Sequence, residues 1–197
     1  MHKKKMDAYL QASKYIDFND GLVAAKATEL AASNAGDRAT AQACYRFVRD
    51  EIQHSWDYGR GPVTCKASDV LRHRTGYCYA KSHLLAALLR ANGIPAGLCY
   101  QRLSVEGAGP PYCLHGLNAV YLSDYGWFRC DARGNNARVS TTFGPPSESL
   151  AFAIREKEER TLPEIWAEPL PIVTATLERY DEVALVHKML PDIPLMG

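Results

Sequence analysis

Residues 73–97 of this 197-residue chain read HRTGYCYAKSHLLAALLRANGIPAG, and they predict a buried central helix that opens at Cys78. The pair Asn92-Gly93 ends this helix before Pro95, because glycine terminates helices and proline cannot continue them. Since one whole face is apolar, we expect the helix to form the centre of the core. That face consists of leucines at helical spacing, namely Leu84, Leu85, Leu88 and Leu89.

Three strands are expected after this helix. Residues 98–103, 117–122 and 127–131 are rich in apolar and aromatic side chains and have strand length. The intervening residues SDYG predict a tight turn, so the last two strands should form a hairpin. Residues 104–113 are polar and rich in glycine and proline, which predicts an exposed loop.

Helices are predicted on both sides of this centre. Residues 21–33, 37–54 and 67–72 carry helical periodicity before it, and residues 152–160 and 173–190 carry it afterwards.

The length fits a single domain with three parts. We expect N-terminal helices over residues 1–54, a central core over residues 55–143 and a helical wrap over residues 144–197. The last part holds seven of the eleven prolines, so it is expected to pack on the core as alternating helix and extended chain rather than form a second domain.

Composition excludes several classes of protein. Lys plus Arg number 23 against 22 Asp plus Glu, and a net charge of +1 does not suit a protein that binds nucleic acid by neutralising phosphates. No apolar run approaches the roughly 20 residues of a membrane span. The first residues, MHKKKMDAYLQ, are basic but lack the apolar stretch of a secretory signal, so we expect a cytoplasmic protein.

The six cysteines raise the question of whether one of them is reactive. They contain no CxxC pair and no Cys/His cluster, so neither a zinc site nor another metal site is expected. Reduced thiols are the better expectation for a chain of this size without a signal peptide. Cys78 differs from the others because a helix N-terminus favours the thiolate. The alternative is that Cys78 is one more small buried residue.

A thiol nucleophile needs a base, and the base needs an orienting partner. His115 begins one strand of the predicted hairpin, and Asp131 ends the other. Because a hairpin brings its open ends together, the two residues should lie side by side at one rim. The alternatives are a strand-edge histidine with no role and an aspartate that serves only the turn in DARGNN.

These residues together resemble the transglutaminase-like superfamily of thiol enzymes, in particular a bacterial branch described as cysteine proteases. The resemblance covers about residues 47–136, and two positions depart from the usual pattern, Leu117 and Cys130. It rests on GYCYAKSHLLAALLRANGIPAG and on HGLNAVYLSDYGWFRCDARGNN, which supply Gly76 and Cys78, the run Leu88, Leu89, Arg90, Gly93, Ile94, Pro95 and Ala96, and then His115, Gly126, Trp127 and Asp131.

The resemblance implies an α+β, papain-like fold, with a Cys-bearing helix on an antiparallel sheet. It implies that Cys78 is the nucleophile, His115 the general base and acid, and Asp131 the residue that orients it. The backbone N–H of Cys78 would stabilise the oxyanion. A second donor is expected from Gln53, His54 or Trp56, with Gln53 and Trp56 favoured because relatives use such side chains.

The expected activity is hydrolysis of a peptide or isopeptide amide through a thioester, with no cofactor. The expected partner is a peptide or protein substrate, with no nucleic acid and no membrane. Two alternatives remain open. The same thioester passed to an amine would make the protein an acyltransferase, and a silent module would use the fold only to bind a peptide.

Overall fold

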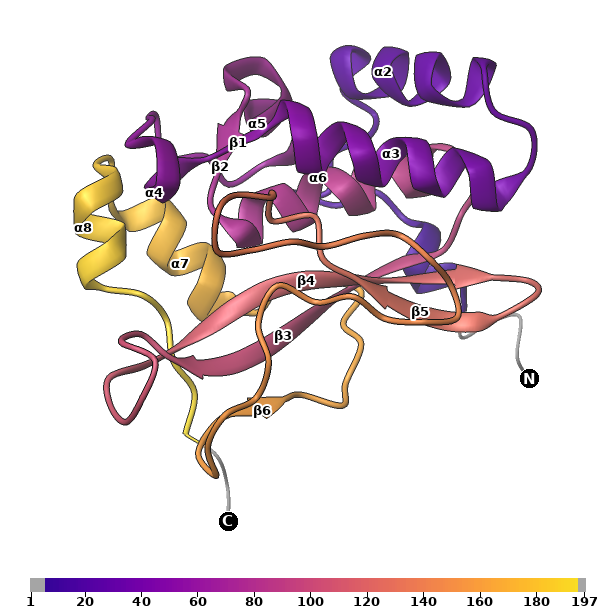
Figure 1. Ribbon diagram of the computed structural model, residues 1–197. Helices are drawn as coiled ribbons and strands as arrows, with labels where there is room; N and C mark the ends of the chain where they lie inside the picture. Colours follow the sequence, from indigo (N-terminus) through magenta and orange to yellow (C-terminus); the bar gives the residue numbers. More distant parts are fainter. Residues whose placement is uncertain (1–5, 195–197) are drawn as a thin grey trace.

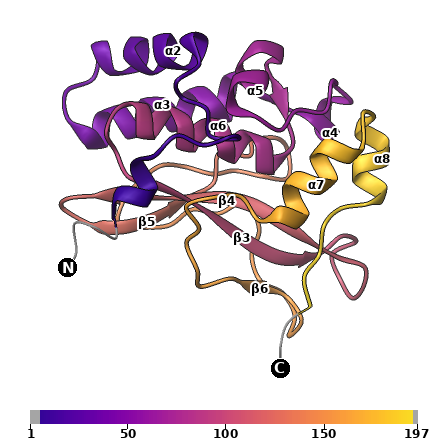
Figure 2. The same cartoon turned by 180° about the vertical axis from the view of Figure 1, so that it is seen from behind.

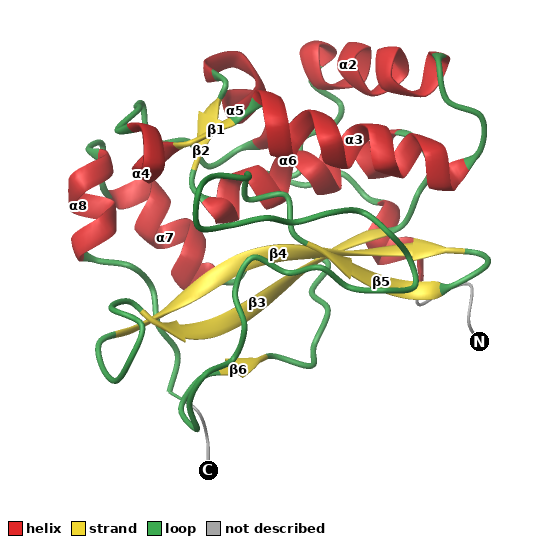
Figure 3. Cartoon of the chain, viewed as in Figure 1, coloured by secondary structure: helices red, strands yellow, loops and turns green. Residues whose placement is uncertain are grey.

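The computed structural model describes residues 6–194, so the basic residues Lys3, Lys4 and Lys5 lie outside the described part. Helices stack on one face of a sheet, and mostly irregular chain covers the other face (Figure 3). The predicted α+β class is confirmed by this arrangement.

The central helix α6 (Cys78–Ala91) lies between the sheet and an outer layer of helices (Figure 1). It packs on strands β3 and β4 on one side, and on α2 (Gly21–Ala32) and α3 (Asp37–Glu51) on the other. Every residue from Cys78 to Arg90 is buried. The helix is therefore surrounded by protein on all sides, and not only along its apolar face. The predicted central position of this helix is confirmed.

The sheet is antiparallel and has the strand order β5-β4-β3-β6. Its strands are β3 (Ala96–Ser104), β4 (Tyr112–Leu122), β5 (Gly126–Cys130) and the short β6 (Arg160–Thr161). The predicted hairpin is therefore present as β4 and β5. On the face away from α6, Leu117 and Ala119 form a small second core that Leu150 and Ile165 cover.

The helix predicted over 37–54 ends at Glu51, which corrects its last three residues. Ile52 is extended, with φ −104° and ψ 114°. Gln53–His54 then form β1, which pairs in parallel with β2 (Thr75–Gly76). The backbone here gains strand partners that a longer helix would lose. Before and after β1 the chain forms the short helices η1 (Asp7–Leu10), α4 (Ser55–Tyr58) and α5 (Ala67–His73).

The helix predicted over 152–160 is wrong. This segment is irregular because its acidic side chains bind backbone N–H groups of the neighbouring loop instead of solvent. Glu159 accepts from the Ser104 N–H at 3.0 Å, and Glu156 accepts from the Gly109 N–H at 2.9 Å. Charged side chains at helical spacing therefore do not indicate a helix here.

The helix predicted over 173–190 is two helices, α7 (Pro171–Arg179) and α8 (Val183–Lys188), separated by extended residues. Val173, Leu177 and Val186 are buried in the main core. Both cartoon views place α7 and α8 at the end of the molecule where α4 lies (Figures 1 and 2). Within residues 6–194, no helix is long and apolar enough to cross a bilayer.

Candidate active site

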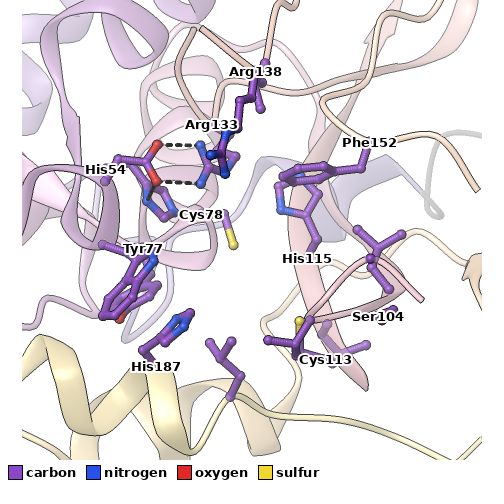
Figure 4. A pocket seen from close by; sticks show the side chains of 18 of the residues that line it. His54, Tyr77, Cys78, Ser104, Cys113, His115, Arg133, Arg138, Phe152 and His187 are labelled. Atoms are coloured by element: carbon purple, nitrogen blue, oxygen red, sulfur yellow. Dashed lines mark hydrogen bonds and ion pairs between the residues drawn. The ribbon is translucent and has the colours of Figure 1, made fainter. Parts of the chain in front are cut away.

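Cys78 is the first residue of α6, and it lines a cleft of about 360 Å³. Tyr77 precedes it in an extended conformation, with ψ 162°, and no side chain caps the helix. Only 7% of Cys78 is exposed, yet its sulfur points into the open centre of the site (Figure 4). A thiol in this position faces the positive end of the helix, which favours the thiolate.

The hairpin places His115 and Asp131 together. His115 lies in β4, Asp131 follows β5 directly, and the His115 Nε2 and Asp131 Oδ2 atoms are 2.7 Å apart. The buried Asp131 also accepts hydrogen bonds from the backbone N–H groups of Ala151 at 2.9 Å and Arg133 at 3.1 Å. These donors hold the carboxylate in place. His115 therefore uses Nε2 for Asp131.

In this geometry the proton lies on the His115 imidazole and not on the Cys78 sulfur. Burial on its own raises the pKa of the Cys78 thiol, but the charge and hydrogen bond of His115, joined by His54, outweigh it and lower the pKa to about 6. Burial lowers the pKa of His115, and the charges of Asp131 and Cys78 outweigh that effect and raise it to about 10. At neutral pH the pair is therefore a thiolate and an imidazolium.

The other five cysteines behave in the opposite way. Burial raises the pKa of the thiol to about 12 at Cys44, Cys65 and Cys113. It raises the pKa to about 11 at Cys99, and Cys130 is also shifted well above its ordinary value. All six cysteines are free, so the difference between them is one of environment and not of disulfide pairing.

Gly116 brings β4 against the start of α6. Its N–H donates to the Cys78 Sγ at 3.4 Å, which adds a donor to the thiolate. A Cβ at this position would lie 3.0 Å from the Cα of Tyr79, so only glycine lets the two elements approach this closely. Asn118, two residues along β4, holds the same helix by donating from Nδ2 to the Ser82 carbonyl at 2.9 Å.

Of the expected side-chain donors for the oxyanion, the structure brings His54 beside the thiol. The Gln53 Oε1 accepts from Arg60 at 2.7 Å, and Gln53 lines a separate cavity rather than the cleft. Trp56 lines the cleft, but its ring is stacked on that of His187, with centroids 3.5 Å apart. Gln53 therefore lies outside the cleft, whereas Trp56 lies at its wall.

His54 and its neighbours form a second imidazole–carboxylate pair. The His54 Nδ1 lies 3.4 Å from the Asp57 Oδ1. Asp57 in turn accepts from both terminal nitrogens of Arg133, at 2.6 and 2.8 Å, and from the Asn136 Nδ2 at 3.0 Å. Arg133 therefore connects the two pairs, because its backbone holds Asp131 and its side chain holds Asp57. No sequence pattern indicated this link, since it depends on how the loop after Asp131 folds back.

The remaining walls of the cleft come from three further parts of the chain. Leu103 and Val105 lie at the end of β3 and in the loop after it. Phe152 packs edge-to-face on the His115 ring, with centroids 4.9 Å apart. His187 and Leu190 belong to α8 and the residues after it. Three of these residues, Phe152, His187 and Leu190, come from the tail over residues 144–197.

No group of three or more His, Cys, Asp or Glu side chains with metal-binding geometry occurs within residues 6–194.

Comparisons with known proteins agree with this geometry. The chain matches the family model of the transglutaminase-like superfamily over residues 24–132, which is more than half of its length. No curated protein matches it. A candidate cysteine protease from Cytophaga hutchinsonii has a similar fold, with a TM-score of 0.53 and 20% identity. So does the periplasmic domain of TgpA from Pseudomonas aeruginosa, with a TM-score of 0.50 and 22% identity.

Each structural match covers 66% of this chain, but only 42% of the Cytophaga protein and 46% of the TgpA domain. At these identities the likeness concerns the fold, which is an α+β fold with helices on an antiparallel sheet. The family-model match covers the segment that carries Cys78, His115 and Asp131. The chain belongs to the transglutaminase-like superfamily.

Proposed function

We propose that the protein is a thiol hydrolase that cleaves a peptide or isopeptide amide bond in a peptide or protein substrate. Cys78 is the nucleophile, His115 the acid and base, and Asp131 the residue that orients His115. The observation that carries this proposal is the arrangement of the three side chains: Cys78 opens α6 in the cleft, and His115 in the same cleft lies 2.7 Å from Asp131. The opposite shifts of the two pKa values, down for Cys78 and up for His115, agree with it.

The reaction follows from these charges. The Cys78 thiolate attacks the carbonyl carbon, a C–S bond forms, and the carbonyl electron pair moves to oxygen. His115 gives its proton to the amide nitrogen, the C–N bond breaks, and the amine leaves a thioester behind. Water then loses a proton to His115 and attacks the thioester, which releases the carboxylic acid and restores the thiolate. The free N–H of Cys78 at the helix start is one donor for the oxyanion.

The test combines selective labelling with product analysis. Iodoacetamide at neutral pH should alkylate Cys78 well before the other five thiols, as read by peptide mass spectrometry. A library of peptide amides and isopeptides should then show hydrolysis that Cys78→Ala abolishes. Equal labelling of all six thiols would contradict the activated nucleophile. Amide products formed only with an added amine would assign the protein to the transamidation alternative, and binding without turnover to the silent module.

We also propose that the protein works in the cytoplasm. All six cysteines are free, which suits a reducing compartment. Because the similar TgpA domain is periplasmic, cell fractionation is the appropriate test. Recovery of the native protein with a cytoplasmic marker enzyme supports the proposal, and recovery with a periplasmic marker refutes it.

A further inference from the structure

We propose that His54 is the side-chain donor that binds the oxyanion formed at Cys78, and that Asp57 and Arg133 are positioning residues that hold it. The inference rests on the proposed function, because an oxyanion forms only if the thiol attacks a carbonyl. It assigns a catalytic role to a residue outside the Cys78, His115 and Asp131 set.

The position of His54 is set by backbone pairing. In the parallel pair of β1 and β2, His54 lies opposite Gly76, two residues before the nucleophile. The imidazole is 6% exposed and packs edge-to-face on Tyr77, with ring centroids 5.6 Å apart. Figure 4 shows His54 and His115 on opposite sides of the Cys78 sulfur. His54 is also one of the groups that lower the pKa of the Cys78 thiol, as expected for a close donor.

The other side of the His54 ring explains why it can donate into the cleft. Nδ1 is buried without a hydrogen-bond partner, and the nearest charged group is the Asp57 carboxylate at 3.4 Å. A carboxylate opposite Nδ1 favours a proton on that nitrogen, since two lone pairs would otherwise face each other. With Nδ1 turned to Asp57, Nε2 is directed away from that carboxylate, and the proposed role requires an N–H there for the negatively charged oxygen.

The carboxylate that faces His54 is itself rigid. Asp57 receives a bidentate pair from Arg133 and a hydrogen bond from Asn136. The pKa of Asp57 lies well below its usual range, so it stays charged: burial opposes this, and the proximity of His54 and Arg133 outweighs it. The donor is therefore oriented before substrate binds, which is the condition for strong oxyanion stabilisation.

His115 is not available for this task. Its Nε2 is occupied by Asp131 at 2.7 Å, and its other side serves the thiol and the leaving group. Gln53 lies in the other cavity, and the Trp56 ring, which also lines the cleft, is stacked on His187. His54 is the lining residue whose backbone pairs with Gly76 and whose ring contributes to the lowered pKa of Cys78, on the side of the sulfur opposite His115.

Two reactions of the Cys78 thiol distinguish oxyanion binding by His54 from an effect of His54 on the thiolate itself. Acylation by p-nitrophenyl acetate passes through an oxyanion: a C–S bond forms, the C–O bond breaks, and p-nitrophenolate leaves without needing an acid. Alkylation by iodoacetamide displaces iodide and forms no oxyanion. Both rates are measured on the full chain at the pH plateau where Cys78 is fully ionised, so that a change in its pKa does not enter.

We expect His54→Ala to slow acylation by on the order of 10²-fold, while the plateau alkylation rate stays within about threefold of wild type. His54→Gln should recover at least about a tenth of the wild-type acylation rate, because its amide nitrogen can occupy the place of Nε2. Asp57→Asn should slow acylation several-fold with the same sparing of alkylation. His73→Ala, at an exposed histidine outside the cleft, is the matched control and should change neither rate.

Equal losses in the two reactions would overturn the proposal, because His54 would then act on the thiolate alone. An unchanged acylation rate in His54→Ala would overturn it as well. If His54→Ala does not fold, the comparison of His54→Gln with Asp57→Asn decides: loss of acylation alone in Asp57→Asn supports the role, and parallel losses refute it. The proposed function is judged separately: Cys78→Ala must abolish both reactions, and His115→Ala must abolish hydrolysis of the peptide amide, whose amine leaving group needs a proton.

Discussion

Burial acts on all six thiols in this chain, but only the Cys78 thiol has its pKa lowered. For five of them the apolar surroundings raise the pKa, whereas the Cys78 thiol is balanced by two imidazoles and a backbone N–H. The low pKa of Cys78 is therefore set by these neighbouring groups and not by its exposed fraction, which is only 7%.

The pH dependence of alkylation follows from these partners. The thiolate fraction of Cys78 should rise with pH through about 6 and then stay level, so the alkylation rate should show one inflection near that pH. His115→Ala removes the largest cause that lowers the pKa of Cys78, and the inflection should move upward, towards the ordinary value of about 8.5. Stopped-flow measurement with iodoacetamide provides the profile. An unchanged inflection in His115→Ala would contradict the thiolate–imidazolium pair.

Asp131→Asn tests the orienting carboxylate. The charge of Asp131 is the largest cause that raises the pKa of His115, so its removal should leave the imidazole uncharged at neutral pH. Hydrolysis of a peptide amide, in which His115 must protonate the leaving amine, should fall by at least about 10³-fold. Asp124→Asn, in the exposed turn between β4 and β5, is the control and should react like wild type. A similar rate in the two variants would mean that Asp131 serves only the turn.

The predictability of the site from the sequence differs between its residues. Cys78, His115 and Asp131 stand at positions that local patterns mark: a helix start and the two ends of a hairpin. His54 has no such mark. Its place beside the thiol depends on the pairing of β1 with β2, which are each two residues long and whose paired residues, such as His54 and Gly76, are 22 positions apart. Strands of two residues are too short to show a periodic pattern, so the sequence does not indicate that they pair.

At the scale of elements, predictions succeeded where local preference and burial agree. The helices α2, α5 and α6 and the strands β3 and β5 are confirmed near the predicted bounds. The strand predicted over 117–122 begins five residues earlier, since β4 starts at Tyr112 inside the segment expected to be a loop. The failures lie at 152–160 and 173–190, where charged or proline-flanked residues have helical spacing. There the backbone follows contacts with the β3–β4 loop and with α4 instead, and these contacts are invisible in a local pattern.

Gly116→Ala tests the close packing of β4 on α6. The new methyl group would meet the Tyr79 backbone at about 3.0 Å and should push the helix start away from the strand. We expect a loss of about 1–3 kcal/mol in the free energy of unfolding. The alkylation rate of Cys78 should also fall, because Gly116 supplies an N–H to its sulfur.

Chemical denaturation and alkylation kinetics measure these two effects. Gly144→Ala is the matched control, since a Cβ there has no neighbour within 4 Å. Wild-type stability and reactivity in Gly116→Ala would show that β4 does not constrain the thiol.

At the scale of the whole molecule, the buried His83 should make stability depend on pH. Burial lowers the pKa of His83 to about 4, while its Nδ1 lies 2.7 Å from the Cys65 carbonyl oxygen. Between pH 4 and its ordinary value of about 6.5, the unfolded chain binds a proton that the folded chain does not. Stability should therefore fall as the pH decreases through this range.

His83 should contribute about 2 kcal/mol to the loss of stability between pH 7 and pH 5. His83→Gln removes this titration, so its free energy of unfolding should fall by about that much less over the same range. Urea denaturation at several pH values measures both curves. Above pH 7 the two curves should run parallel, which serves as the internal control. Equal losses on acidification would show that His83 does not carry the effect.

The match to the superfamily ends at residue 132, whereas Phe152, His187 and Leu190 reach the cleft from beyond it. Part of the cleft wall therefore lies outside the stretch that the family model covers. Under the proposed function, changes in the later stretch would alter substrate preference, whereas Cys78, His115 and Asp131 all lie in the earlier one. Sequence likeness confined to the earlier stretch is for this reason a guide to the reaction and a poor guide to its target.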